Sequence, residues 1–317
     1  MSDWTTFTDP LLLRILSATC AVPDLESAES AYAQWLDYRV VERGKVDPWL
    51  AAAWQAPAAA GLRFCTMAPA NETDVFIRLV ETPPVPGYRS LTTFGWNAFE
   101  IIVDDVHALA DRLKDGPFHT LAPPRPLGAM PSIVAMQVAG PGGECLYFTM
   151  ESGNRDTSIL PKPSGFVGRT FIVVAAGPDF DSMLGWYVST FRLRQRPIRQ
   201  SKVHVLQRAQ GLGPDHAIPL SAIGLKEHGN LLELDGYPTG AGFIAGPRPR
   251  SAGHLPPGNA IVSFEVADLG PFESLALVPP QSVSGAGYDG RRVMTLIGPA
   301  GEIIELVERS NCPKTRT

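Results

Sequence analysis

The sequence predicts an α+β fold built from four tandem units, each with the order strand, helix and three strands (βαβββ). The main observation is internal repetition, because three pairs of segments are similar in the two halves of the chain: 22–38 with 177–193, 98–105 with 263–268, and 139–151 with 297–309. The 30 glycines and 30 prolines among 317 residues form no low-complexity block and favour many short elements joined by turns. A repeated unit of short strands with one helix accounts for both observations.

Each unit is expected to begin with an apolar strand, an aspartate and an amphipathic helix. The predicted first strands are 15–22, 97–103, 170–176 and 260–266, followed by Asp24, Asp105, Asp179 and Asp268. Each aspartate stands where its carboxylate can accept hydrogen bonds from the free amides of a helix N-terminus, so we expect caps there rather than catalytic groups. Three strands follow the helix, and in the third unit they are predicted at 191–198, 217–225 and 230–237.

A polar segment separates the two halves of the chain. Residues 152–164 contain Pro161 and Pro163 and show no hydrophobic periodicity, which is typical of a linker. We therefore predict an N-terminal domain over 1–151 and a C-terminal domain over 165–317, with two units in each.

The composition excludes several classes of protein. With 27 basic and 32 acidic side chains the formal net charge is −5, which gives no positive field for binding nucleic acid. No apolar stretch approaches the ~20 residues that cross a bilayer, and the acidic N-terminus is unlike a signal peptide, so we expect a cytoplasmic protein without a membrane span. The cysteines lack metal-binding or disulfide spacing and are expected to be buried thiols: Cys20, Cys65, Cys145 and Cys312.

The chain resembles the vicinal oxygen chelate superfamily over about residues 12–309. The resemblance rests on the four βαβββ units, on the helix motif that runs from Asp24 to Tyr32, and on the G-P-x-G-E motif near the last strand of each half. This superfamily includes glyoxalase I, methylmalonyl-CoA epimerase, bleomycin-resistance proteins and type I extradiol dioxygenases. The resemblance implies two half-barrel cups of mixed sheet with flanking helices, in which the first and last strands of each unit direct metal ligands inward.

Counting along the strands gives the residues expected at these inward positions. The first-strand position is taken as seven residues before the capping aspartate, and the last-strand position as the glutamate of patterns such as LLEL. In the N-terminal half the positions are Ser17, Arg78, Asn97 or Ala98, and Tyr147, a set that does not suit a divalent ion and predicts a degenerate site. In the C-terminal half they are Ile172, Glu233, Ile261 and Glu305, so the two histidines of the extradiol dioxygenases are replaced by isoleucine.

Glu233 and Glu305 are therefore the candidate catalytic residues and candidate metal ligands in a C-terminal cup. In one interpretation they hold a divalent cation such as Fe, Mn, Zn or Mg, or act as a general acid and base with raised pKa values. In the other, both strands are half-exposed and the glutamates face solvent or a neighbouring arginine. The fold resemblance points the glutamates inward but does not decide between the two interpretations.

Five further residues are candidates for substrate binding. Arg192, Arg194 and Arg196 alternate along a predicted strand and share one face, which is either an anion site inside the cup or a solvated sheet edge. His204 and His254 lie in segments that would overhang the cup, with a surface role as the alternative. The proline-rich connections 123–132 and 247–257 either cover a cleft or simply join strands.

The resemblance implies one of two functions. The first is a lyase, isomerase or dioxygenase of the glyoxalase or dioxygenase type that acts on a small oxygenated metabolite, anionic or aromatic in character. The second is a metal-free protein that binds or sequesters a ligand, as the bleomycin-resistance proteins do. The sequence leaves open whether the chain forms a homodimer.

Overall fold

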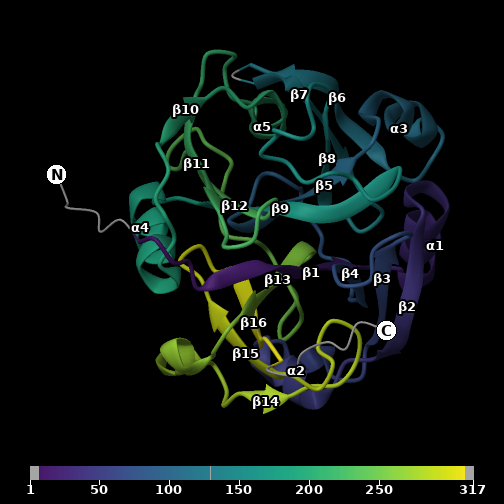
Figure 1. The fold of residues 1–317 in the computed structure, drawn as a ribbon, viewed down its shortest axis with the longest axis vertical. Helices are drawn as coiled ribbons and strands as arrows, with labels where there is room; N and C mark the ends of the chain where they lie inside the picture. The colour runs from purple at the N-terminus through teal and green to yellow at the C-terminus, as the bar shows by residue number, and fades with distance from the viewer. Residues whose placement is uncertain (1–6, 129, 311–317) are drawn as a thin grey trace.

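The computed structural model describes residues 7–128 and 130–310, which form two eight-stranded mixed sheets (Figure 1). The first sheet has the strand order β14-β15-β16-β13-β1-β4-β3-β2, and the second has the order β10-β11-β12-β9-β5-β8-β7-β6. The predicted α+β fold of tandem βαβββ units in two cups is confirmed. Among the described residues, no helix has the length and apolar character needed to cross a membrane.

The four units follow one another along the chain with the predicted element order. The first contains β1 (Leu12–Val22), α1 (Leu25–Leu36), β2 (Tyr38–Lys45), α2 (Pro48–Ala53), the 3₁₀ helix η1 (Pro57–Ala59), β3 (Arg63–Pro69) and β4 (Phe76–Glu81). The second contains β5 (Gly95–Val103), α3 (Val106–Leu113), β6 (His119–Leu127), β7 (Met130–Ala139) and β8 (Cys145–Glu151). The third contains β9 (Val167–Gly177), α4 (Phe180–Phe191), β10 (Arg199–Ser201), α5 (His204–Gln210), β11 (Ile218–Gly224) and β12 (Leu231–Gly236). The fourth contains β13 (Gly258–Val266), the 3₁₀ helix η2 (Gly270–Leu275), β14 (Gln281–Ser282), β15 (Arg292–Ile297) and β16 (Ile303–Glu308).

Each sheet combines one unit from each half of the chain. β1 pairs antiparallel with β13, so the first and fourth units share the first sheet. β5 pairs antiparallel with β9, so the second and third units share the second sheet. The expectation that the two units of one half form a cup together is therefore wrong. Because the four units are alike in pattern, the repeat does not reveal which first strands hydrogen-bond to each other.

Local signals explain where the helices begin and end. Asp24, Asp105 and Asp179 cap α1, α3 and α4 through their side chains, as predicted. The fourth unit differs from the prediction, because Asp268 is followed by a short 3₁₀ helix rather than an α-helix. The helical run there is confined between Gly270 and the Pro279–Pro280 pair, and a residue before proline disfavours helical geometry.

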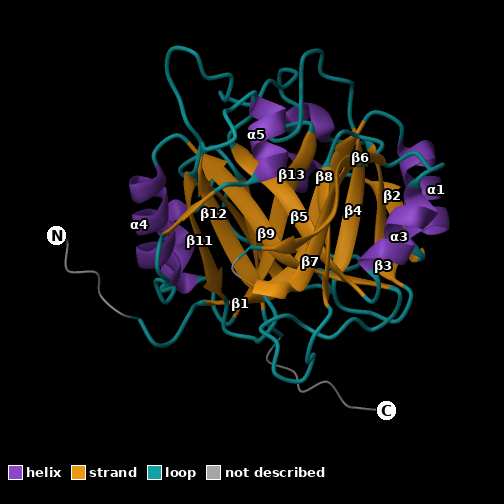
Figure 2. Cartoon of the chain, turned by 90° about the horizontal axis from the view of Figure 1, so that it is seen from above, coloured by secondary structure: helices purple, strands orange, loops and turns teal. Residues whose placement is uncertain are grey.

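The two sheets pack around a shared apolar core. The largest cluster of buried side chains combines one face of each sheet with α1, α3 and α4, which lie at the periphery of the strands (Figure 2). The opposite faces curl around α2 in the first sheet and α5 in the second (Figure 1). We call these opposite faces the first cup, formed by β1, β4, β13 and β16, and the second cup, formed by β5, β8, β9 and β12.

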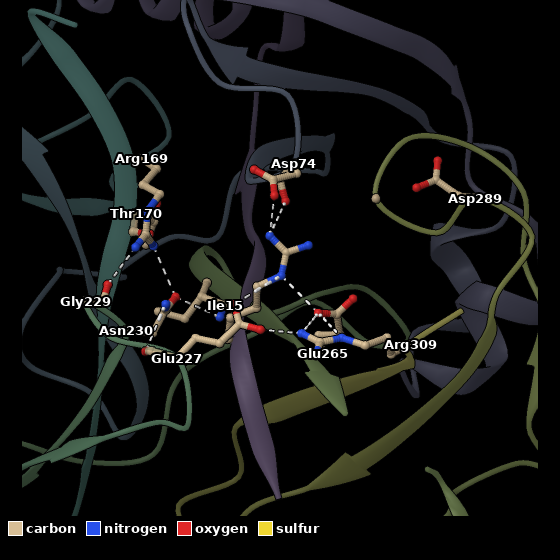
Figure 3. A network of polar contacts seen from close by, with 12 residues as sticks. Ile15, Asp74, Arg169, Thr170, Glu227, Gly229, Asn230, Glu265, Asp289 and Arg309 are labelled. Carbon is tan, nitrogen blue, oxygen red and sulfur yellow. Dashed lines mark hydrogen bonds and ion pairs between the residues drawn. The ribbon is translucent and has the colours of Figure 1, made fainter. Parts of the chain in front are cut away.

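Polar contacts also connect the sheets at one end of the molecule. Glu265 of β13 accepts hydrogen bonds from Arg14, Arg291 and Arg309, at 3.0, 2.8 and 2.7 Å. Arg309 also contacts Glu227, which lies between two strands of the second sheet (Figure 3). The side-chain oxygen of Asn230 accepts from the backbone of Ile15 and from Arg169, both at 3.1 Å, and so joins β1 to β9. Asp74 beside Arg14 and Asp289 beside Arg291 complete the network, so its four arginines are matched by four carboxylates, which is typical of a structural contact.

The G-P-x-G-E motif builds two equivalent contacts between the units. Glu144, in the turn before β8, accepts a hydrogen bond from the Tyr32 hydroxyl of α1 at 2.9 Å. Glu302, in the turn before β16, accepts one from Tyr187 of α4 at 2.6 Å. A β-carbon on Gly298 would lie 2.1 Å from a carboxylate oxygen of Glu302, so this glycine makes room for the folded-back glutamate.

Candidate active site

The strand register identifies one pair of facing positions in each unit. In each unit, the predicted last-strand residue lies beside a residue of the first strand. That first-strand residue stands five places before the aspartate that follows the strand. The four pairs are Thr19–Arg78, Glu100–Tyr147, Val174–Glu233 and Ser263–Glu305. The last-strand residues counted from the sequence therefore face first-strand residues two places later than those counted, so the two counts do not describe facing positions. A shift of two residues keeps a side chain on the same face of a strand, so alternation alone could not reveal it.

The first cup is closed by its own side chains. Glu305 is fully buried and accepts hydrogen bonds from Trp54 at 2.9 Å, from Tyr288 at 2.9 Å and from Ser263 at 2.5 Å. Arg78, 3% exposed, donates to the Tyr288 hydroxyl at 2.7 Å and lies 3.9 Å from the Glu305 carboxylate. The guanidinium neutralises the glutamate, and Trp54 and Tyr288 fill the space above them, so this cup is a packed core.

The second cup is partly exposed to solvent. Along each strand, side chains that face the cup alternate with side chains that face the buried core. Several of the cup-facing side chains are partly exposed: Gln137, Tyr147, Leu220, Ala222, Leu231 and Glu233. Their strand neighbours on the opposite face are buried, as Phe148 and Leu232 show. Solvent therefore reaches part of the second cup, whereas the first is filled by its own side chains.

Three carboxylic acids gather in the second cup. Glu100 stands on β5, while Glu233 and Asp235 stand two residues apart on β12 and share its face. Burial raises the pKa of Glu100 to about 8, with a further rise from the charge of Glu233 and an opposing hydrogen bond from the Thr149 hydroxyl at 2.5 Å. Burial raises the pKa of Glu233 to about 7, and burial with the charge of Glu233 raises that of Asp235 well above its usual value. Each of these carboxyls therefore holds its proton to a higher pH than an exposed carboxyl does.

Two tyrosines complete the second cup. The charges of Asp235 and Glu233 add to burial in raising the pKa of Tyr147, and Asp235 acts in the same way on Tyr237. Arg248 opposes the rise at Tyr237 and lies over the ring of Tyr88, 5.6 Å from its centre. Its guanidinium donates to Thr93 and to backbone carbonyls of both sheets, including that of Asn259 at 2.5 Å. It therefore braces β5 against β13 rather than neutralising the carboxyls.

The structure separates the two glutamates predicted to act together. Glu233 lies on β12 in the second sheet, and Glu305 lies on β16 in the first. The prediction that they line one cup is wrong, because it assumed that the third and fourth units pair. Glu233 remains a site candidate, but its partner in the cup is Glu100.

The predicted substrate-binding residues lie outside the second cup's carboxyl cluster. Arg192 ends α4 in a left-handed conformation, and Arg194 and Arg196 follow in a loop, so the strand expected at 191–198 is not formed. The backbone of Leu193 bonds to Val188 and closes the helix there. All three arginines are exposed.

The two histidines and the proline-rich connections also have defined places. His204 is exposed at the start of α5, and His254 lies beside η1 at the first cup, where Gly253 accepts a hydrogen bond from Ala58. The segment 123–132 belongs to the β6–β7 hairpin, and 247–257 joins β12 to β13. A surface hollow of about 590 Å³ beside Asp179 and Phe180 lies on the α4 side of the second sheet, away from the cup.

Neither cup offers a donor set that fits a divalent cation. In the first cup the Arg78 guanidinium lies where a second ligand would be needed, and in the second Val174 has no donor atom. Among the described residues, no group of three histidine, cysteine, aspartate or glutamate side chains is arranged to hold a metal ion. The ligand set predicted from Glu233 and Glu305 is not assembled, because the two residues lie on different sheets. The described cysteines Cys20, Cys65 and Cys145 are free and buried, as expected, and Cys312 lies outside the described residues.

Glu100 and Asp235 were missed by sequence reasoning, although signals for both exist. Glu100 is the counterpart of Thr19, Val174 and Ser263, five residues before an aspartate. Asp235 follows Glu233 by two residues in LLELD and so shares its face.

Comparisons with known structures support the fold. Glyoxalase I from Zea mays superposes with a TM-score of 0.58 at 16% identity, covering 93% of this chain and 92% of that one. A protein from Bacillus subtilis, named as a proposed dioxygenase, gives a TM-score of 0.63 at 10% identity, covering 95% of this chain and 86% of that one. No protein-family model matches the sequence, and no curated protein sequence matches it. The chain thus has the fold of the vicinal oxygen chelate superfamily, as the sequence predicted.

Proposed function

We propose that this protein is an enzyme of the glyoxalase-like kind that moves a proton within a small oxygenated metabolite, and that the second cup is its active site. The observation that carries the proposal is the pair Glu100 and Glu233. Both carboxyls are surrounded by protein on a face that solvent reaches, and both have pKa values raised toward neutral pH. Perturbed carboxylic acids of this kind are suited to general acid–base catalysis.

The two glutamates are placed to work on opposite sides of a small substrate. β9 lies between β5 and β12, so the two backbones are about 10 Å apart, with Glu100 beside Ile172 and Glu233 beside Val174 of β9. Glu100, with the higher pKa, is the proposed acid, and Glu233 is the proposed base. The hydrogen bond from Thr149 orients the Glu100 carboxyl.

The proposed reaction step is proton transfer next to a carbonyl group. The Glu233 carboxylate takes a proton from the carbon beside the carbonyl, and that C–H electron pair forms the C=C bond of an enol. The carbonyl π pair moves to oxygen, which receives the proton of Glu100. When the neighbouring carbon carries a hydroxyl, the Glu100 carboxylate takes that hydroxyl proton and the O–H electron pair forms a new C=O bond. The C=C pair takes the proton of Glu233 at the former carbonyl carbon, which completes an isomerisation and restores both glutamates. The low polarity of the cup favours such a transfer between groups whose pKa values are close.

The test uses isotope exchange, which needs no knowledge of the natural product. The protein is incubated in D₂O at neutral pH with a panel of 2-oxo acids, hydroxyketones and hydroxyaldehydes, and loss of the carbon-bound proton is followed by ¹H NMR. We expect exchange with at least one compound, reduced about 100-fold or more in Glu100→Gln and in Glu233→Gln. Glu305→Gln is the matched control, because it alters the equivalent last-strand residue of the closed cup.

Two results would count against the proposal. Exchange that persists unchanged in both second-cup variants would place the chemistry elsewhere. Saturable binding of a panel compound without any exchange would favour the alternative, a ligand-sequestering protein of the bleomycin-resistance type.

A further inference from the structure

The acid groups of the second cup have no described cation to neutralise them. For Glu100, Glu233 and Asp235, the influences on the pKa are burial, the other carboxyl groups and the Thr149 hydroxyl. In the first cup, by contrast, Glu305 has the Arg78 guanidinium 3.9 Å away. The second cup thus concentrates negative charge, when ionised, at a face that solvent reaches.

One of these acids also has an unused hydrogen-bonding atom. Asp235 is only 5% exposed, and its Oδ1 has no hydrogen-bond partner among the described residues. This atom is the one carboxyl oxygen among the ten buried side-chain atoms without a partner in the described residues, and its desolvation is not compensated. Asp235 shares the face of Glu233 on β12, so the unused acceptor belongs to the same cup.

The groups around the acids are aromatic and apolar. Tyr147 and Tyr237 lie close enough to Asp235 for its charge to raise their pKa values. Phe171, Ile172 and Val174 of β9 belong to the apolar cluster of this cup. Aromatic rings beside carboxylates are suited to an organic cation, which gains both ion pairing and contact with the ring faces.

We infer that the second cup binds a ligand that carries an organic ammonium group, with Asp235 and Glu233 as its counter-ions. The inference rests on the proposed function, because it names the substrate class of the same site. It replaces the expectation of an anionic substrate, which depended on arginines that lie exposed outside the cup.

Binding of a cation must be linked to proton release. The titratable groups around the ammonium site are Glu100 of β5, Tyr147 and Cys145 of β8, Glu233 and Asp235 of β12, and Tyr237 and Tyr88. The charge of Arg248 acts on Tyr237 and Tyr88 and is not among the influences on the carboxyl groups. The raised pKa values mean that the carboxyls hold protons near pH 7, and a bound cation favours their ionised forms. Affinity should therefore rise with pH, up to about tenfold per pH unit for each proton released.

The experiment compares probes of like shape and different charge. Phenethylammonium, neutral 3-phenylpropanol and anionic 3-phenylpropionate are titrated into the full chain by calorimetry at pH 6, 7 and 8, in phosphate and in HEPES. We expect phenethylammonium to bind most tightly, to bind more tightly at pH 8 than at pH 6, and to give buffer-dependent heats that report proton release. Asp235→Asn should weaken it about 10- to 100-fold, and Glu305→Gln should leave it unchanged.

Three results would overturn the inference. The first is 3-phenylpropionate binding as tightly as the amine, and the second is an unchanged affinity in Asp235→Asn with retained thermal stability. The third is Mn²⁺ or Mg²⁺ binding at the cup and excluding the amine, since the occupant would then be a metal ion. Failure here is distinguishable from failure of the proposed function, because Glu100-dependent isotope exchange on uncharged carbonyl compounds does not require ammonium binding.

Discussion

The hydroxyl of Tyr187 donates a hydrogen bond to the carboxylate of Glu302 at 2.6 Å, although the two residues are 115 positions apart in the chain. Tyr187 is on α4, which packs on the second sheet, and Glu302 precedes β16 of the first sheet. The pair Tyr32 and Glu144 repeats the contact between the other two units. These contacts tie the two sheets together at two equivalent places, and they give the repeated motifs a structural reason.

Removing the Tyr187 hydroxyl should destabilise the fold without changing its architecture. Tyr187→Phe leaves the buried Glu302 carboxyl without its side-chain donor, at an expected cost of about 1–3 kcal/mol in the free energy of unfolding. Tyr32→Phe should have a similar effect through Glu144. Urea denaturation monitored by circular dichroism measures both, and a change below about 0.3 kcal/mol in either variant would contradict the assigned role.

The same glutamates should make stability depend on pH. Burial raises the pKa values of Glu144 and Glu302 to about 7 in the folded protein, above the usual value of 4.5. The folded state therefore binds more protons than the unfolded state between about pH 4.5 and 7. The contribution is fully present below the unfolded pKa and is lost as pH rises through the folded pKa, by roughly 1–3 kcal/mol per carboxyl.

The Glu144→Gln, Glu302→Gln double variant isolates this contribution. An amide side chain does not titrate, so the unfolding free energy of the variant should fall less steeply between pH 5 and 7.5 than that of the unaltered protein. Other carboxyls titrate in both proteins, and their effects cancel in the comparison. Parallel stability curves from urea denaturation would show that these two glutamates are not the source.

Arg78 and Glu305 should be strongly coupled in the first cup. Arg78→Met leaves the buried Glu305 without a neutralising charge, and we expect a loss of about 3–5 kcal/mol in the free energy of unfolding. Adding Glu305→Gln to that variant should recover part of the loss, because the uncompensated charge is then gone. A double-mutant cycle by chemical denaturation gives the coupling energy, and additive losses would show that the two groups do not interact.

The proposed acid–base pair predicts a narrow pH optimum for isotope exchange. The working state needs Glu233 ionised and Glu100 protonated, and their pKa values of about 7 and 8 favour this state between those pH values. The exchange rate should fall at lower and at higher pH. In Glu100→Gln, the residual exchange rate should no longer fall at alkaline pH. A rate that rises monotonically to pH 10 would indicate that a different group is the acid.

Much of the fold could be read from the sequence because it depends on local patterns. The capping aspartates Asp24, Asp105 and Asp179 were found because a cap is set by residues two or three places away. The predicted strand at 191–198 failed because the αL cap at Arg192 and the hydrogen bond that closes α4 were not visible in the alternation of charge.

The site was predicted only in part. Glu233 and Glu305 could be singled out in the sequence, since a glutamate between apolar residues stands out in a buried strand. Glu100 was missed because the sequence count selected the position seven places before Asp105, whereas Glu100 stands five places before it. Both positions share one face of the strand, and only the hydrogen-bond register distinguishes them.

The sequence by itself determined the repeated unit, the caps at Asp24, Asp105 and Asp179, and the buried-strand glutamates Glu233 and Glu305. Tertiary structure decided which units share a sheet, and therefore that Glu233 faces Glu100 while Glu305 faces Arg78. The reason is physical. A repeat is encoded by short-range patterns that each unit carries alone, whereas the pairing of β1 with β13 and of β5 with β9 depends on backbone hydrogen bonds between strands far apart in the chain.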